Sequence, residues 1–436
     1  MRKLALVLTL VILPFKAWAV DVERVISPGG IEAWLVQDHS NPVVSMRFAF
    51  EGGSELDPVG KSGLANLAAS TMDEGAGDID SRAFQQTLAD QSITLRFSAG
   101  LDGFSGQVKT LTENLDQSID LLRLALTQPR FDDEPLARLK SQIIAGIRND
   151  SENPGKLAYD ALFTSFFPGH GYALDSDGKV EEVEAITQDD LKTFVETHLA
   201  QSNLIIGVVG DVTPKRLGLL LDQAFEKLPA KPTVARAVET KVNATGRLQI
   251  IDRAIPQSTI VFGHGGLKRE DPDYYAALVM NHVLGGGSFT SRLYEEIREK
   301  RGLAYSVGSS LYPLDHAGLV VGSAATENAR VSETIDVIRA EWARMAAGEL
   351  GEQELNDAKT YITGSFPLTF TSTGAIARVL VAMQLNKLGI DYLDKRNAYI
   401  GSVSMGDVKR VAAQYLRPDQ LDIVVVGKPA GIVPSP

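Results

Sequence analysis

The sequence predicts an α+β protein built from two similar domains in tandem. Its 436 residues exceed the roughly 250 to 300 at which a single core usually stops growing. Two segments match each other as a helix followed by an apolar strand, ITQDDLKTFVETHLAQSNLIIGVVGDV from Ile186 and VSMGDVKRVAAQYLRPDQLDIVVVGKP from Val403, with Gly210 and Gly427 at the same point. So long a repeat indicates duplicated domains rather than a solenoid. Runs of strands and helices without regular βαβ alternation favour an α/β sandwich in each half, a mixed sheet with helices packed on it.

The first half contains apolar or alternating segments typical of strands. Pro28-Gly29-Gly30 separates two short runs, which favours a strand pair with a tight turn, and Gly100-Leu101-Asp102 separates two more. Residues 43–50 alternate apolar and polar side chains, as a half-buried strand does. The strands predicted here are a pair within residues 25–36, then residues 43–50, 93–98, 103–110 and 204–209.

Helices are predicted where apolar residues recur every three or four positions. One begins near Ser62 and ends at Gly75, with Leu64, Leu67 and Met72 on one face. Pro135 suits the first turn of another, because proline needs no backbone partner there. The helices predicted in this half are residues 62–75, 111–126, 135–149 and 188–198.

The second half repeats this order after a stretch rich in Pro, Ala and Lys. A strand comes first, then a helix with a glycine-rich entry, two strands and two more helices, before the repeated tail. The predicted elements are the strand 258–263, the helix 292–301, strands around Tyr305 and Leu319, and helices 331–347 and 352–364.

The segment from Gly285 to Gly308 is the most distinctive part of this half. Thr290 or Ser291 can cap its helix, and Glu295–Arg298 and Glu296–Lys300 have the spacing of ion pairs. Gly302 suits the C-terminal cap, and residues 304–311 alternate as a strand. Arg298 and Tyr305 therefore meet where a helix passes into a strand. On the residues alone, a solvated surface helix is the alternative interpretation.

The N-terminus is typical of a secretory signal. Arg2 and Lys3 precede the apolar run from Leu4 to Pro14, and Ala17 and Ala19 form a cleavage site. The run is much shorter than the roughly 20 residues that span a bilayer, so we expect cleavage after Ala19 and no membrane anchor. The predicted location is the periplasm or the outside of the cell.

Composition excludes several functional classes. The absence of Cys removes disulfides, thiolate catalysis and thiolate metal sites. The formal charge is −12, and loss of Arg2, Lys3 and Lys16 with the signal makes it −15. So acidic a chain, without a basic stripe, argues against nucleic acid or anionic lipid as a partner.

The sequence also lacks the common catalytic motifs. None of its six histidines lies three to five residues from another, so no helix presents two imidazoles to zinc. No G-x-S-x-G sequence occurs, and Ser176 to Lys179 matches S-x-x-K only within a polar loop. The run Gly285-Gly286-Gly287-Ser288 lacks the lysine of a phosphate-binding loop.

The chain resembles the pitrilysin (insulinase-type) metallopeptidases, most closely the bacterial members built from two short chains. The resemblance rests on the duplicated halves, on GGGSFTSRLYEEIREKRGLAYSVGSS from Gly285, and on the repeated V-V-G tail, and it covers essentially the whole mature chain. It implies two homologous α/β-sandwich domains that form half of a clamshell, at residues 20–230 and 247–436, after a signal peptide at 1–19 and on either side of a linker at 231–246.

The zinc motif of that family is missing. Catalytic members carry H-x-x-E-H on the helix after the first strands and a further glutamate on a later helix. The resemblance places Asn66 and Ser70 at the histidine positions, Ala69 at the first glutamate and Gly146 near the second. No H-x-x-E-H occurs anywhere in the sequence, so we expect no metal or other cofactor in this chain.

The other half of the family's site is retained. The resemblance matches Arg298 and Tyr305 to an Arg and Tyr pair that holds the substrate backbone near the metal. It implies a metal-free partner subunit of a heterodimeric zinc metallopeptidase, whose zinc lies in a homologous chain with H-x-x-E-H, and whose substrates are unfolded or short peptides. One alternative is a structural or peptide-binding scaffold of the same fold without a role in catalysis. Another is an independent hydrolase with an unrecognised site.

Overall fold

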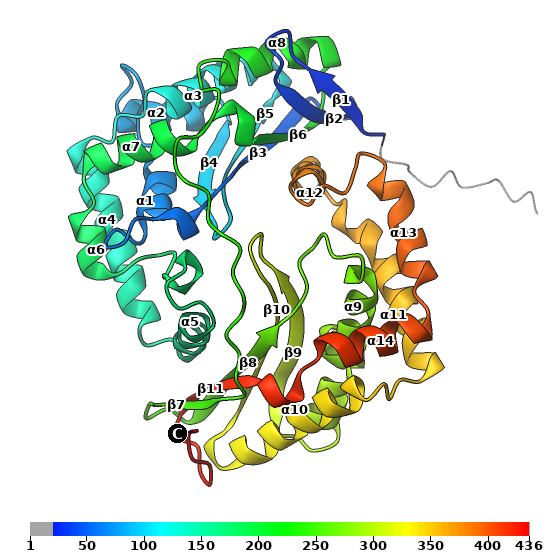
Figure 1. The fold of residues 1–436 in the computed structure, drawn as a ribbon. Helices are drawn as coiled ribbons and strands as arrows, with labels where there is room; N and C mark the ends of the chain where they lie inside the picture. The colour runs from blue at the N-terminus through cyan, green and yellow to red at the C-terminus, as the bar shows by residue number, and fades with distance from the viewer. Residues whose placement is uncertain (1–20, 436) are drawn as a thin grey trace, which may run out of the picture.

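The computed structural model describes residues 21–435, so the predicted signal peptide lies outside the described residues. It contains two mixed β-sheets, one above the other in Figure 1, with helices around both. The predicted fold class, two α/β sandwiches in tandem, is confirmed. No helix among the described residues is long and apolar enough to cross a bilayer.

The two sheets share one strand order, apart from an extra strand in the first. The first has the order β1-β2-β6-β3-β5-β4 and the second β7-β11-β8-β10-β9. In each, one neighbouring pair is parallel, β2 with β6 and β7 with β11. The strands are β1 (Glu23–Ile26), β2 (Glu32–Gln37), β3 (Val43–Glu51), β4 (Thr94–Ala99), β5 (Gly103–Leu111), β6 (Leu204–Gly210), β7 (Leu248–Asp252), β8 (Gln257–Gly265), β9 (Ala304–Pro313), β10 (Gly318–Glu327) and β11 (Asp422–Gly427).

Two details show how the repeat is packed. Phe48 lies opposite Gly106 in the first sheet, and Phe262 lies opposite Gly322 in the second. Each ring covers its glycine so closely that a Cβ there would lie 2.2 or 2.3 Å from the ring, so only glycine fits. Gly210 and Gly427, at the ends of β6 and β11, both have positive φ, 138° and 151°.

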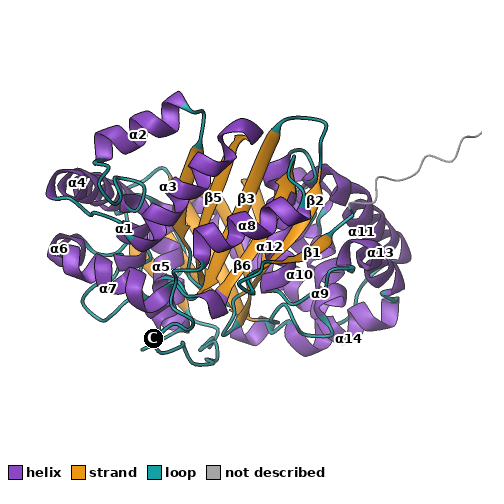
Figure 2. Cartoon of the chain, turned by 90° about the horizontal axis from the view of Figure 1, so that it is seen from above, coloured by secondary structure: helices purple, strands orange, loops and turns teal. Residues whose placement is uncertain are grey.

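Helices cover both faces of both sheets. They are α1 (Leu64–Thr71), α2 (Ser81–Asp90), α3 (Leu115–Thr127), α4 (Asp133–Asp150), α5 (Pro154–Phe166), α6 (Val180–Ala185), α7 (Gln188–His198), α8 (Pro214–Phe225), α9 (Tyr274–Asn281), α10 (Val331–Ala346), α11 (Glu352–Ser365), α12 (Thr373–Leu385), α13 (Tyr392–Ser402) and α14 (Met405–Tyr415). Figure 2 shows α3 and α8 lying across β3, β5 and β6.

Each half also supplies one helix to the other half's sheet. Helix α12 packs on β3 and β6 of the first sheet, and α5 packs on β8 and β11 of the second (Figure 1). Successive strand residues therefore enter different cores: Val208 packs among the helices of its own half, whereas Val209 packs against Ala377 and Leu380 of α12. This exchange makes the two halves one packed unit.

Three local predictions were wrong. The helix predicted over 62–75 is shorter, because α1 begins at Leu64 and ends at Thr71; the Asp57 carboxylate accepts hydrogen bonds from the backbone N–H groups of Gly63 and Ala65 at its start, at 2.9 and 3.0 Å. The helix predicted over 111–126 begins only at Leu115, because Leu111 still belongs to β5. The helix predicted over 292–301 is wound as a π-helix between Tyr294 and Glu299.

Candidate functional site

Arg298 and Tyr305 lie on two elements joined by a tight C-terminal cap. Arg298 is in the π-helix and Tyr305 is the second residue of β9. Between them Gly302 has φ +58°, and the N–H groups of Gly302 and Leu303 donate to the carbonyls of Arg298 and Ile297 at 3.0 and 2.8 Å. These two bonds resemble a Schellman cap widened by one residue, as expected after a π-helix, and a residue tolerant of positive φ completes it without strain. The predicted cap and strand are confirmed.

The cap brings the two side chains into contact. The Arg298 guanidinium carbon lies 4.5 Å from the centre of the Tyr305 ring and 4.9 Å from that of Tyr294, so two aromatic faces hold the cation. Arg298 donates no hydrogen bond and forms no ion pair with any of residues 21–435. Tyr305 is 81% exposed. The oriented guanidinium of Arg298 thus lies beside the exposed phenol of Tyr305.

The neighbouring charges are satisfied within the segment. Glu296 pairs with Lys300 at 2.6 Å and also with Arg301, and Glu295 pairs with Lys300 at 3.0 Å. The predicted pair between Glu295 and Arg298 does not form. Thr290 and Ser291 do not cap the helix through their side chains, which donate to the carbonyls of residues 287 and 288. These pairings leave Arg298 as the segment's unpaired cation within the described chain.

The pair lies at the edge of a sheet. Strand β9 pairs on one side with β10 and has no strand on its other side in the described chain. A pocket of about 510 Å³ lies beside it, with the aromatic side chains of Tyr159, Phe163 and Tyr312 in its lining. An open edge with adjacent space suits an extended peptide, which adds to a sheet through backbone hydrogen bonds.

The positions of the lost zinc motif hold either small residues or polar side chains that already form hydrogen bonds. Asn66 donates from Nδ2 to Asp177 at 3.0 Å, and the Ser70 hydroxyl donates to the Asn66 carbonyl at 2.9 Å. Ala69 is 3% exposed and lies in the hydrophobic core, where its methyl group offers no ligand to a metal. Gly146, on α4, is exposed, and a Cβ at this position would have no neighbour within 4 Å.

The residues on α1 and α4 therefore do not fit a catalytic zinc ion. Zinc needs imidazole, carboxylate or thiolate ligands, and neither an amide already hydrogen-bonded nor a serine bonded to its own helix replaces them. Among residues 21–435, the one group of three metal-ligating side chains that converge lies elsewhere and includes none of these positions.

Sequence similarity to known proteins identifies the family of this chain. An uncharacterized zinc protease of Streptomyces coelicolor is 30% identical over 314 residues, which cover 71% of this chain and 68% of the relative. A family model described as peptidase M16 inactive domain matches residues 185–362. The chain belongs to the peptidase M16 family. The predicted resemblance to the pitrilysin-type peptidases is thereby confirmed.

Other M16 relatives bear on activity. A non-peptidase homolog of Helicobacter pylori is 27% identical over 334 residues, 76% of this chain and 77% of the relative. A crystal structure of a peptidase M16 inactive domain from Pseudomonas fluorescens has a TM-score of 0.87 at 28% identity, and covers 95% of this chain and 100% of that one. Together with the missing ligands, these matches support a non-catalytic M16 protein.

The sequence prediction missed the aromatic support of Arg298. Tyr294 stacks on the guanidinium, and Phe289 packs edge-on against Tyr294 with ring centres 5.0 Å apart. A signal was present, because Tyr294 precedes Arg298 by four residues and this spacing places two side chains on one helical face.

Proposed function

We propose that this chain is the partner subunit of a zinc metallopeptidase and carries no catalytic zinc itself. A homologous M16 chain with H-x-x-E-H would supply the metal and the general base, and the pair would act in the periplasm or outside the cell. The observation that carries the proposal is the Arg298 guanidinium, held between two rings without any hydrogen bond or ion pair in the described chain.

The chemistry of the pair suits a peptide at an active site. A guanidinium offers a rigid set of donors to backbone carbonyls, and a phenol can donate to an oxygen on which negative charge develops. The substrates would be unfolded or short peptides, because backbone recognition tolerates many sequences. A scaffold without a role in catalysis has no chemical need for these two groups.

Kinetics of the mixed pair test this role. Arg298→Ala and Tyr305→Phe should each lower turnover on the order of 10²-fold, since each removes a donor to the transition state. Arg301→Ala is the matched control, because Arg301 comes from the same segment and pairs with Glu296. Co-purification of the two chains should be unaffected in all three variants. Unchanged turnover in both Arg298→Ala and Tyr305→Phe would favour the scaffold instead.

A further inference from the structure

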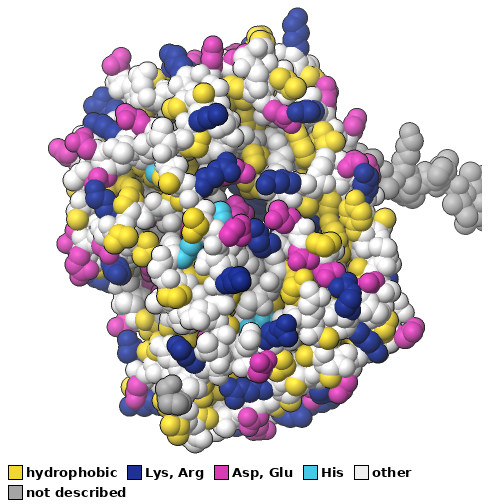
Figure 3. Space-filling model, in the orientation of Figure 1, with side chains coloured by type: hydrophobic (Ala, Val, Ile, Leu, Met, Phe, Trp, Pro, Cys, Tyr) yellow, Lys and Arg dark blue, Asp and Glu magenta, His cyan; other side chains and the backbone are white. Residues whose placement is uncertain are grey.

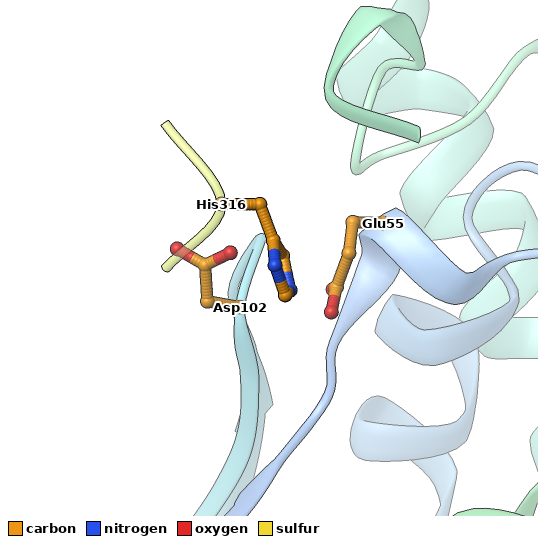
Figure 4. Close-up of side chains that lie close together, drawn as sticks. All are labelled: Glu55, Asp102 and His316. Carbon is orange, nitrogen blue, oxygen red and sulfur yellow. The ribbon is translucent and has the colours of Figure 1, made fainter. Parts of the chain in front are cut away.

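Three turns from both halves meet between the two sheets. Glu55 follows β3, Asp102 lies in the turn between β4 and β5, and His316 lies in the turn between β9 and β10. Each offers one ligand-type atom, and these atoms all lie within 4.8 Å of one another. Figure 4 shows the Glu55 carboxylate and the His316 ring facing each other, with Asp102 beside them.

Two of these groups keep atoms that form no hydrogen bond in the described chain. Glu55 is 7% exposed, and its Oε2 accepts a hydrogen bond from the Gly53 N–H at 2.7 Å. Its other oxygen, Oε1, accepts none from any of residues 21–435. The His316 ring forms no hydrogen bond within the same range, and its nearest carboxylate, Glu239, is 3.8 Å away. Glu55, a residue that is more than nine-tenths buried, thus places one carboxylate oxygen without a hydrogen-bond donor in the described chain near the His316 ring.

Asp102 is held in place by groups outside the cluster. The Tyr172 hydroxyl donates to Oδ1, and the Asp315 N–H donates to Oδ2 at 3.1 Å. The Tyr172 oxygen in turn accepts a hydrogen bond from the backbone N–H of His316 at 3.1 Å. Carboxylates that bind metals are commonly oriented in this way by surrounding donors.

The two acidic side chains of the cluster lie without a basic partner. Neither Glu55 nor Asp102 forms an ion pair with Lys or Arg in the described chain. Lys268 lines a pocket of about 270 Å³ together with Glu55 and His316, but its ammonium group pairs with Glu239 at 2.8 Å. Figure 3 shows a hollow near the middle of the molecule, with histidine and acidic side chains beside it.

We propose that Glu55, Asp102 and His316 bind a divalent transition-metal cation of the zinc type. One imidazole nitrogen and two carboxylate oxygens form a ligand set that zinc accepts, with solvent in the remaining position. Zinc ligands at about 2.0–2.2 Å from the ion lie no more than about 4.4 Å apart, so the three side chains need to close only slightly. The bound ion would link the first half of the chain to the turn between β9 and β10 in the second half.

This site is separate from the degenerate positions on α1 and α4 and independent of the proposed peptidase role. It revises the expectation that the chain carries no cofactor. Metal content of this chain alone reports on the cation site, whereas turnover of the mixed pair reports on Arg298 and Tyr305, so one proposal can fail without the other.

Zinc binding to the purified chain tests the proposal. The protein, made without a histidine tag and stripped with a chelator, should bind one zinc ion in calorimetry and elemental analysis and should unfold at a higher temperature with zinc. Glu55→Gln and His316→Ala should each weaken binding about tenfold or more. His39→Ala is the matched control, because His39 pairs with Asp211 at 2.6 Å outside this cluster, and it should bind zinc as the parent does.

A zinc-soaked crystal of the unmodified chain provides a second measurement that does not depend on how the variants fold. An anomalous peak between the three side chains would support the site. Failure to bind zinc, binding that survives in both Glu55→Gln and His316→Ala, or an anomalous peak elsewhere would overturn it.

Discussion

At the scale of single residues, Arg298 is distinguished by its lack of an ion pair or hydrogen bond within the described chain. Arg298 lies among five charged neighbours in sequence, and only the structure shows that Glu296, Lys300 and Arg301 satisfy one another. The sequence predicted Arg298 and Tyr305 through spacing and resemblance. It could not predict Glu55, Asp102 and His316 as a group, because they are far apart in the chain and meet only through folding.

Two other histidines are buried in neutral form. His264 is fully buried; its Nε2 accepts the Trp342 indole N–H at 2.8 Å, which leaves Nδ1 to donate to the Gly265 carbonyl. His198 is stacked on Phe194 with ring centres 4.2 Å apart. Burial lowers the pKa of each to about 4. The unfolded chain, with a histidine pKa near 6.5, therefore binds protons more readily than the folded one.

The stability of the chain should consequently fall in mild acid. A depressed histidine pKa contributes stability above about pH 6.5 that is lost as the pH falls toward 4, about 2 to 3 kcal/mol per histidine. His198→Gln should reduce the loss in unfolding free energy between about pH 7 and about pH 4.5 by that amount, measured by urea unfolding. The parent and the variant share every carboxylate, so their difference isolates this histidine. Equal losses in the two proteins would contradict the assignment.

At the scale of elements, the exchange of α5 and α12 joins the two halves. Ser45 and Arg47 of β3 hydrogen-bond to Thr373 and to the Gly374 carbonyl at the start of α12, at 2.8 and 3.2 Å. Gly207 of β6 lies directly beneath the helix, where a Cβ would come within 2.8 Å of the Ala377 carbonyl oxygen and of the Leu380 Cβ. The absence of a side chain there permits this close approach.

Gly207→Ala should therefore loosen the exchanged helix. The added methyl group forces α12 away from the sheet, and we expect a loss of about 1–3 kcal/mol in unfolding free energy, measured by urea or thermal unfolding. Gly146→Ala is the control: the site is open and helical, so the same change should add roughly 0.5–1 kcal/mol. A Gly207→Ala protein as stable as the parent would show that α12 does not need this contact.

Most elements of both sheets were predictable from sequence, but the exchange was not. Strands such as 43–50 and 204–209 show the expected apolar pattern, and α7 begins and ends as predicted at Gln188 and His198. Helices α5 and α12 were not predicted, and it is these that cross between the halves. A helix pattern indicates an apolar face but does not indicate which sheet that face will cover. The π-helix at Arg298 was also missed, because its register depends on tertiary packing.

At the scale of the whole molecule, Arg298 and Tyr305 lie in the second half, and the four positions of the zinc motif in the first half hold no metal-ligating side chain. The edge strands β4 and β9 occupy equivalent places in the two sheets, and the retained Arg and Tyr lie at the second of them. The family match and the groups at Asn66, Ala69, Ser70 and Gly146 support a chain without peptidase activity of its own. The domain boundaries at residues 230 and 247 and the heterodimer remain predictions.

Reconstitution with an H-x-x-E-H chain tests whether this chain is the partner subunit of a zinc metallopeptidase. An unfolded peptide labelled for cleavage would be incubated with this chain alone, with the partner alone, and with both, in the presence and absence of a zinc chelator. We expect no cleavage by this chain alone. The mixture should cleave more peptide than the partner alone, and the chelator should abolish this cleavage. Cleavage by this chain alone that persists with the chelator would contradict this expectation.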